Sequence, residues 1–121
     1  MIQAEIPPSG DWGPSLTARH IISGSATIRE TLVALNQLSG DSMTLFAIDT
    51  DGRLIGSVTD GDIRRAIIAG HTTDDPVSGI AFRNFISLPA DASPQERYRT
   101  GAKAHERRVN LLPVTSDGRL T

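Results

Sequence analysis

Apolar and polar positions alternate most regularly between residues 28 and 38. Four apolar side chains recur there at helical spacing: Ile28, Leu32, Leu35 and Leu38. Thr27 and Glu30 stand at the positions of a capping box, in which a hydroxyl and a carboxylate bind the free amides at a helix start. The pattern therefore predicts a helix over residues 28–38 with one buried stripe, ended by Gly40.

A β-hairpin and a second helix are predicted next. Residues 43–49 and 54–58 have the composition of strands, and Asp51-Gly52 between them supplies the positive φ of a hairpin turn. Thr59 then caps a helix that runs to about residue 69 and stops at Gly70. With a short strand over residues 19–22, the unit is predicted to be strand, helix, strand, strand, helix.

The same unit recurs later in the chain. A shift of 66 residues aligns Asp51-Gly52-Arg53-Leu54 with Asp117-Gly118-Arg119-Leu120. The same shift aligns the first capping box with Ser93-Pro94-Gln95-Glu96, which is a capping box with proline at the first helical position. The second copy breaks off inside its hairpin, so we expect the sequence to be a piece of a longer polypeptide.

These patterns divide the chain into three parts. Residues 1–18 are rich in proline and glycine and lack a period, so we predict an irregular arm whose Trp12 packs back on the protein. Residues 19–80 form the first repeat and residues 81–121 the second, incomplete one. Between the repeats, Asp74-Asp75-Pro76-Val77 is predicted to be a short capped turn of helix, and Ile86-Ser87-Leu88 opens the second repeat as a strand.

The segment Gly56-Ser57-Val58-Thr59-Asp60-Gly61-Asp62-Ile63, inside such a tandem, resembles the cystathionine β-synthase (CBS) domain pair. The resemblance covers nearly all of residues 19–121. It implies an α+β fold of two strand-helix-strand-strand-helix repeats and a regulatory role without catalysis. It also implies a homodimer formed through the helices.

The same resemblance implies a binding site for an adenosine nucleotide, namely AMP, ADP or ATP. In the family the hydroxyl of the motif contacts the phosphate or the ribose, and the aspartate binds the two ribose hydroxyls. The adenine lies in an apolar slot between strands. Independently, the start of a helix offers free amides and a positive dipole end to an anion. The predicted ligand-binding residues are Thr59, Asp62, Arg64, Arg65, Ile22, Ser23 and Ala47.

A longer segment, from Val58 to Ala66 and on through Gly70 to Val77, restricts the resemblance to two kinds of CBS pair. It looks like the CBS pairs joined to arabinose-5-phosphate isomerases or to sugar-phosphate nucleotidyltransferases. In the nucleotidyltransferases the pair precedes the catalytic domain, and here the pair begins near Met1. We therefore expect a covalently linked nucleotidyltransferase domain in the parent protein.

Three other interpretations stay open. Thr59 and Asp62 could form only a helix cap, worth about 1 kcal/mol. The pair could be a structural dimerisation module that binds no ligand. A sugar phosphate or sugar nucleotide could take the place of the adenosine nucleotide.

Composition and charge exclude several other classes. A formal charge of −2 and a pI near 5.8 argue against non-specific binding to nucleic acid or to an anionic membrane surface. There is no cysteine, no long apolar segment and no signal peptide, which fits a cytoplasmic protein. The five basic residues of the second repeat's first helix are expected to face solvent: Arg97, Arg99, Lys103, Arg107 and Arg108.

No metal site or active site is predicted. His20, His71 and His105 lack ligand spacing, so we expect them at the surface or at caps. Asp49-Thr50-Asp51-Gly52 resembles the start of a calcium loop, but Leu54 stands where an EF-hand needs glycine. Phosphate-binding loops and nucleophile elbows are absent from the sequence.

Overall fold

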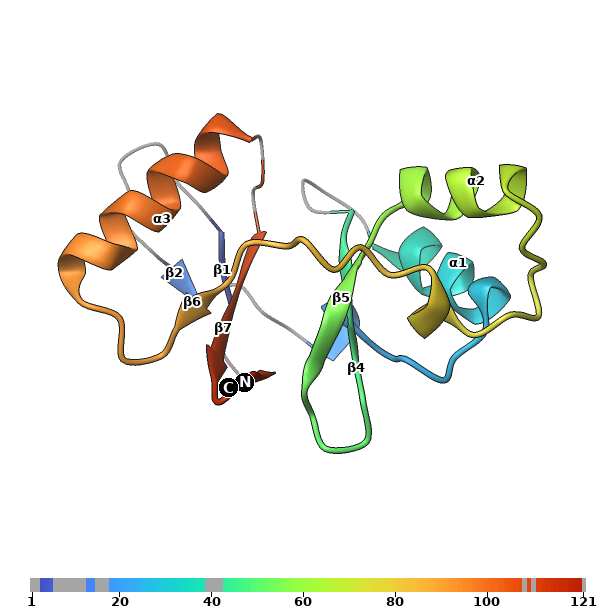
Figure 1. Ribbon diagram of the computed structural model, residues 1–121, viewed down its shortest axis with the longest axis horizontal. Coiled ribbons are helices and arrows are strands. Elements are labelled where there is room, and N and C mark those ends of the chain that lie inside the picture. Colours follow the sequence, from blue (N-terminus) through green and yellow to red (C-terminus); the bar gives the residue numbers. More distant parts are fainter. Residues whose placement is uncertain are drawn as a thin grey trace. The chain divides into compact units, whose positions relative to one another are not determined.

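The computed structural model describes residues 3–5, 13–14, 18–38, 43–107, 109 and 111–120. The chain divides into two compact units (Figure 1). The first unit comprises Ala18–Phe85, and the second comprises Met1–Thr17 together with Ile86–Thr121. The predictions for Trp12, Gly40 and Arg108 lie outside the described residues, and the predicted repeat boundaries at residues 19–80 and 81–121 stay a prediction.

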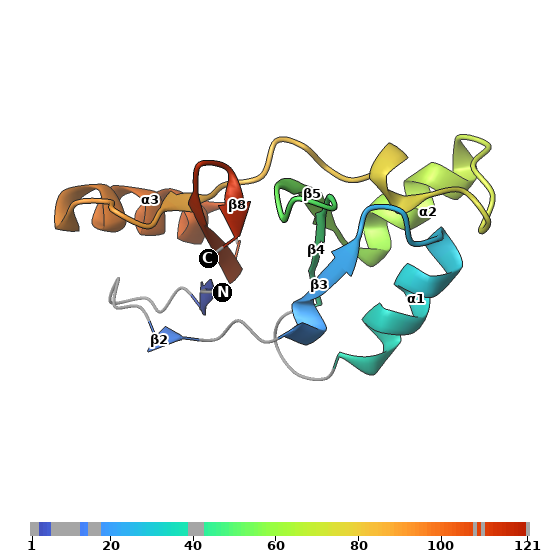
Figure 2. The same ribbon diagram turned by 90° about the horizontal axis from the view of Figure 1, so that it is seen from below.

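The first unit has the predicted order of elements. In chain order it contains a 3-10 turn at Ala18–His20, β3 (Ile21–Ser23), α1 (Ile28–Gln37), β4 (Leu45–Ile48), β5 (Leu54–Val58), α2 (Asp60–Ile68) and a 3-10 turn at Val77–Gly79. The sheet order is β3-β4-β5, with β3 parallel and β5 antiparallel to β4. Both helices lie on the same side of this sheet (Figure 2).

The start of α1 confirms the first capping box. Glu30 donates its backbone N–H to the Thr27 hydroxyl at 3.1 Å, and the Glu30 carboxylate accepts the Thr27 amide at 2.9 Å. The hydrogen bond from the Thr27 amide, together with one from the Thr27 hydroxyl at 3.1 Å, holds the pKa of Glu30 below its ordinary value, since both favour the charged carboxylate. Leu35 is buried as predicted, but Leu32 is 36% exposed and was wrongly assigned to the stripe. Thr31 is buried instead, because its hydroxyl bonds the Thr27 carbonyl at 2.9 Å.

The segment after α2 differs from the prediction. Gly70 ends the helix region with φ +106°, as expected for a glycine at this position. The predicted capped turn at residues 74–77 is instead a 3-10 turn preceded by Pro76, without a side-chain cap. Asp75 accepts the Thr72 amide at 2.9 Å and lies 3.2 Å from His71 Nδ1. The Asp75 carboxylate therefore contacts residues of the preceding loop and does not cap the 3-10 turn.

The second unit is built on β7. Its elements are β1 (Gln3–Glu5), β2 (Gly13–Pro14), β6 (Leu88–Pro89), α3 (Pro94–Glu106), β7 (Leu111–Ser116) and β8 (Arg119–Leu120). The sheet order is β2-β1-β7-β6, and β8 also pairs with β7. Two short stretches of the predicted irregular arm thus lie in strands, because β7 offers them an edge to pair with.

The second unit repeats local features of the first with a smaller core. Ser93 caps α3, and the buried positions of this helix are Gly101 and Ala104. The corresponding residues of the first unit are Leu35 in α1 and Leu38 at its C-cap. The second hairpin turns through Asp117 and Gly118, both with positive φ. In the first hairpin the same Asp-Gly pair lies in a longer loop, because Asp49 Oδ1 accepts the amides of residues 51 and 53, both at 2.9 Å.

Candidate functional site

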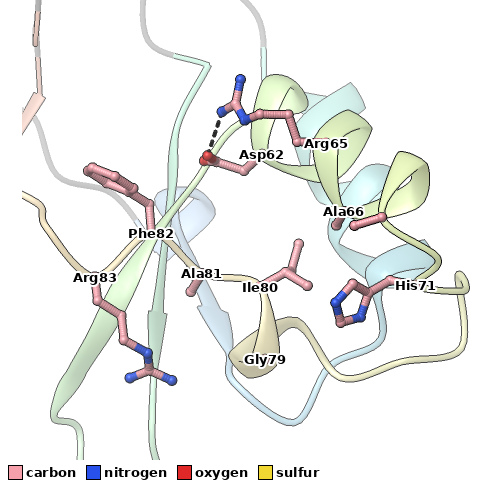
Figure 3. A pocket seen from close by; sticks show the side chains of 10 residues that line it. Asp62, Arg65, Ala66, His71, Gly79, Ile80, Ala81, Phe82 and Arg83 are labelled. Carbon is pink, nitrogen blue, oxygen red and sulfur yellow. Dashed lines mark hydrogen bonds and ion pairs between the residues drawn. The ribbon is translucent and has the colours of Figure 1, made fainter.

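A pocket of about 350 Å³ lies within the first unit, between α2 and the segment that follows the second 3-10 turn (Figure 3). Asp62, Arg65 and Ala66 of α2 line it, and so does Ala69, which directly follows the helix. Residues 79–83 form the opposite wall, and His71 also lines the pocket. Its volume falls within the range of about 300–1,000 Å³ that is usual for small-molecule sites.

Residues 79–83 are held in place by the sheet. Phe82 accepts the Ser57 amide at 3.0 Å and donates its own amide to the Ser57 carbonyl at 2.8 Å. The neighbouring Gly56 lies so close that an added Cβ would be 2.6 Å from the Phe82 carbonyl oxygen. The glycine of the sequence motif therefore permits the close approach of the two backbones that forms the wall of the pocket.

Asp62 connects the helix cap to the pocket. Its Oδ2 accepts the Thr59 amide at 2.9 Å and the Thr59 hydroxyl at 3.0 Å, and the Asp62 amide donates to that hydroxyl at 3.3 Å. Its Oδ1 accepts Arg65 Nη2 at 2.8 Å, at the side of the pocket seen in Figure 3. The Asp62 side chain is 13% exposed and that of Arg65 is 72% exposed. One carboxylate oxygen thus stabilises the helix, while the other bonds a cation that solvent can reach.

This arrangement suits a ligand that carries hydroxyls and an anionic group. A carboxylate oxygen has lone pairs for hydroxyl donors, and a guanidinium presents a planar fork to phosphate. Three basic side chains, Arg65, His71 and Arg83, line the pocket with one acid, Asp62. Arg83 Nη2 also donates to the Ser78 carbonyl at 3.0 Å.

The other predicted site residues are not part of the pocket lining. Arg64 is exposed and outside the lining, whereas its neighbour Arg65 lines the pocket. Thr59 is engaged in the cap. Ile22 and Ala47 pair across β3 and β4, where Ala47 is fully buried. Their roles in ligand binding stay predictions.

Ser23 also lies outside the pocket lining. Its hydroxyl is 2.8 Å from that of Ser25, and it accepts the Ser25 amide at 3.2 Å. The side chain is exposed, and its role in binding likewise stays a prediction.

Of the residues that line the pocket, sequence reasoning predicted Asp62 and Arg65. Among those that it missed are His71, Phe82 and Arg83. They belong to segments without hydrophobic periodicity, and only the pairing of Phe82 with Ser57 brings residues 79–83 to α2. A weak signal was present in the sequence, because the aromatic Phe82 is followed directly by Arg83. In the structure Phe82 is 50% exposed.

His71 and Asp75 lie together at the loop after α2. Hydrogen bonding from the Thr72 amide lowers the pKa of Asp75, and the nearby His71 acts in the same direction. His20, which was predicted to lie at the surface or at a helix cap, is only 4% exposed, because the 3-10 turn that carries it packs against β4.

Among the residues that the structure describes, no three His, Cys, Asp or Glu side chains come together in a way that could hold a metal ion. None of the described helices has the length and apolar character needed to cross a bilayer.

Known structures share this fold. Staphylococcus aureus OpuCA is 22% identical with a TM-score of 0.65, and the match covers 84% of this chain and 80% of that one. The cystathionine β-synthase pair domain of a predicted Mg²⁺ transporter from Shewanella oneidensis MR-1 is 23% identical with a TM-score of 0.64, over 97% of this chain and 62% of that one. A CBS-domain-containing protein from Agrobacterium tumefaciens is 18% identical with a TM-score of 0.58, over 84% and 73% of the two chains. No family model and no curated protein sequence matches the chain.

Proposed function

Starting from the α+β fold of a CBS pair, we propose that this chain is a regulatory module without catalysis that binds an adenosine nucleotide, AMP, ADP or ATP. The observation that carries the proposal is the position of Asp62. Asp62 lines the pocket. Its Oδ2 accepts a hydrogen bond in the helix cap, and its Oδ1 accepts one from the exposed Arg65.

Binding of the ribose is assigned to Asp62. Because Arg65 is largely exposed, it can leave Oδ1 without losing buried contacts, and the two ribose hydroxyls can then donate to that oxygen. The released guanidinium is well suited to a phosphate group. On binding, Asp62 therefore exchanges its ion pair with Arg65 for hydrogen bonds to the ribose. Because basic side chains outnumber acidic ones in the pocket lining, the pocket favours an anionic ligand such as a nucleotide.

The base is assigned to the opposite wall. Phe82 is 50% exposed, so its ring offers an apolar surface on which a purine can stack. The backbone at Phe82 is fixed by its two hydrogen bonds to Ser57, which reduces the ordering cost of binding.

Calorimetric titration with AMP, ADP and ATP tests the proposal. Asp62→Asn keeps the size of the side chain but removes its charge, and it should weaken binding at least tenfold. Asp60→Asn is the matched control, since Asp60 is an exposed acid of the same helical turn outside the pocket lining, and it should bind like the unmodified chain. Lack of binding by the unmodified chain at millimolar nucleotide would exclude the sensing function.

The two adjacent arginines provide a second comparison. Arg65→Ala should lower the affinity for ATP more than the affinity for adenosine, because Arg65 is proposed to bind phosphate and adenosine has no phosphate. Arg64→Ala should change neither affinity, since Arg64 does not line the pocket. Competition between ATP and a sugar phosphate or sugar nucleotide decides which class of ligand the pocket prefers.

We also propose that the module controls a covalently linked sugar-phosphate nucleotidyltransferase. Control requires the ligand to favour one arrangement of the pair over another. The test is to assay a longer polypeptide that contains this chain for nucleotidyl transfer with and without AMP, ADP or ATP. An activity that is present and unaffected by all three nucleotides would refute this part of the proposal.

A structural dimerisation module is the second candidate. Two apolar side chains of α1, Leu32 and Val33, are 36% and 54% exposed, and two of α2, Ile67 and Ile68, are 42% and 80% exposed. Exposed apolar surface of this kind is typical of association. If this candidate is right, the double variant Val33→Ser, Ile68→Ser should be monomeric by analytical ultracentrifugation where the unmodified chain is a dimer, and no nucleotide should bind to either.

A further inference from the structure

His71 lines the pocket, but the binding of base and ribose described above gives it no role. Two backbone hydrogen bonds place it by folding the chain back onto the last turn of α2. Gly70 donates its amide to the Ile67 carbonyl at 3.1 Å, and His71 donates its amide to the Ala66 carbonyl at 3.0 Å. Gly70 permits this reversal with a φ of +106°. His71 is therefore fixed at the C-terminal end of α2, next to the part of the pocket that Ala66 lines.

The imidazole of His71 is oriented by Asp75. Asp75 Oδ2 lies 3.2 Å from His71 Nδ1 and accepts the Thr72 amide at 2.9 Å. Hydrogen bonding from that amide lowers the pKa of Asp75, so the carboxylate is charged at neutral pH and can only accept hydrogen bonds. His71 Nδ1 therefore carries the hydrogen of this contact. Because Asp75 is not part of the pocket lining, Nε2 is the ring nitrogen left for a ligand.

The pocket follows α2 from Asp62 to His71. Figure 3 shows Phe82 and His71 at opposite ends of the lining, with Asp62 between them. About 9 Å of helix separates Asp62 from the last residue of α2, and the small side chains of Ala66 and Ala69 line this stretch. With the base on Phe82 and the ribose at Asp62, the phosphates of a nucleotide point toward His71.

We propose that His71 binds the phosphates that follow the first one in a nucleotide, and that it thereby selects ATP over AMP. The proposal rests on the nucleotide-binding function proposed for this pocket. AMP ends at its first phosphate, which is assigned to Arg65, whereas the further phosphates of ATP extend along α2. The His71 side chain is 42% exposed, so a ligand in the pocket can reach it.

This contact requires a charged imidazole. A phosphate oxygen accepts hydrogen bonds, and with Nδ1–H directed at Asp75, an Nε2–H exists only when both ring nitrogens are protonated. Binding of ATP at His71 therefore takes up a proton. The charged side chains that surround the ring are Asp75 from its own loop, and Asp62, Arg65 and Arg83 from the pocket lining.

Calorimetric titration of a histidine variant tests the contact. His71→Asn retains an amide donor near the position of Nδ1 but has no atom at the position of Nε2. It should bind ATP about tenfold more weakly, because a hydrogen bond to a charged group is lost, and it should bind AMP as the unmodified chain does. His105→Asn is the matched control, since His105 is exposed on α3 and outside the pocket lining, and it should change neither affinity. An equal loss for ATP and AMP, or no loss for ATP, would overturn the proposal.

The pH dependence of binding provides a second readout. His71→Gln places a neutral amide near the position of Nε2. The affinity of the unmodified chain for ATP, divided by that of His71→Gln, should fall several-fold between about pH 6 and about pH 8, where an imidazole loses its charge. The ratio cancels the titration of the phosphates of ATP, because both proteins bind the same ligand. A ratio that does not change with pH contradicts proton uptake at His71.

Binding of AMP separates a failure at His71 from a failure of the nucleotide-binding function. If the chain binds AMP, Asp62→Asn weakens that binding and His71→Asn leaves the affinity for ATP unchanged, the role of His71 is refuted and the nucleotide-binding function stands. If neither AMP nor ATP binds at millimolar concentration, both are refuted.

Discussion

Substitution of Gly56 by alanine should destabilise the first unit by about 2–3 kcal/mol, within the usual cost of overpacking a core. The added Cβ would lie 2.6 Å from the Phe82 carbonyl oxygen and 2.9 Å from the Ala81 Cβ. The nearest atom belongs to backbone and cannot rotate away, so residues 81–82 must move from β5. That movement breaks the two hydrogen bonds between Ser57 and Phe82, each worth about 0.5–1.5 kcal/mol.

The assay is urea unfolding followed by circular dichroism. With a slope of about 1 kcal/mol per molar urea, the midpoint should fall by about 2–3 M. Gly79→Ala is the matched control, because no atom lies within 4 Å of the Cβ added there, and its midpoint should stay close to that of the unmodified chain. If Gly56→Ala unfolds at the same urea concentration as Gly79→Ala, the close approach of Phe82 to β5 does not exist in solution. Nucleotide binding should fall in parallel, since the same movement opens the pocket wall.

Two further predictions concern α1. Leu35→Ala should lower the unfolding free energy by about 2–5 kcal/mol, because Leu35 is 1% exposed, whereas Leu32→Ala should cost less than about 1 kcal/mol; equal costs in urea titrations would contradict the assigned burial. The cap of α1 should weaken in acid. The lowered pKa of Glu30 means that its contribution is complete above the unfolded value of about 4.3 and is lost as the pH falls through the folded value. Glu30→Gln should therefore flatten the acid limb of a pH titration of stability, and an unchanged limb would contradict this.

The predicted fold agrees with the structure where hydrogen bonds are local. The capping boxes of the three described α-helices, at Thr27, Thr59 and Ser93, join residues three apart in the sequence, so their partners are visible without tertiary information. The order strand, helix, strand, strand, helix follows from these helix starts and from the Asp-Gly turn, and the first unit confirms it.

The candidate site was only partly visible in the sequence. Asp62 and Arg65 lie in the first turns of a predicted helix, and both line the pocket. The choice between Arg64 and Arg65 could not be made, because a helix start does not tell which side of the helix another segment will cover. Phe82 reaches the site through its pairing with Ser57, a contact across 25 residues that no local pattern encodes.

For this protein the sequence alone determined where helices begin, where chains turn and that two copies of one unit exist, since each depends on side chains within a few residues of one another. Only the tertiary structure decided that Leu32 is exposed, that Phe82 forms the wall of a pocket, and that residues 3–5 pair with β7. The physical reason is that backbone groups of a strand edge bond any extended segment that reaches them. The choice of partner therefore depends on which distant segments meet, and not on the identity of the residues alone.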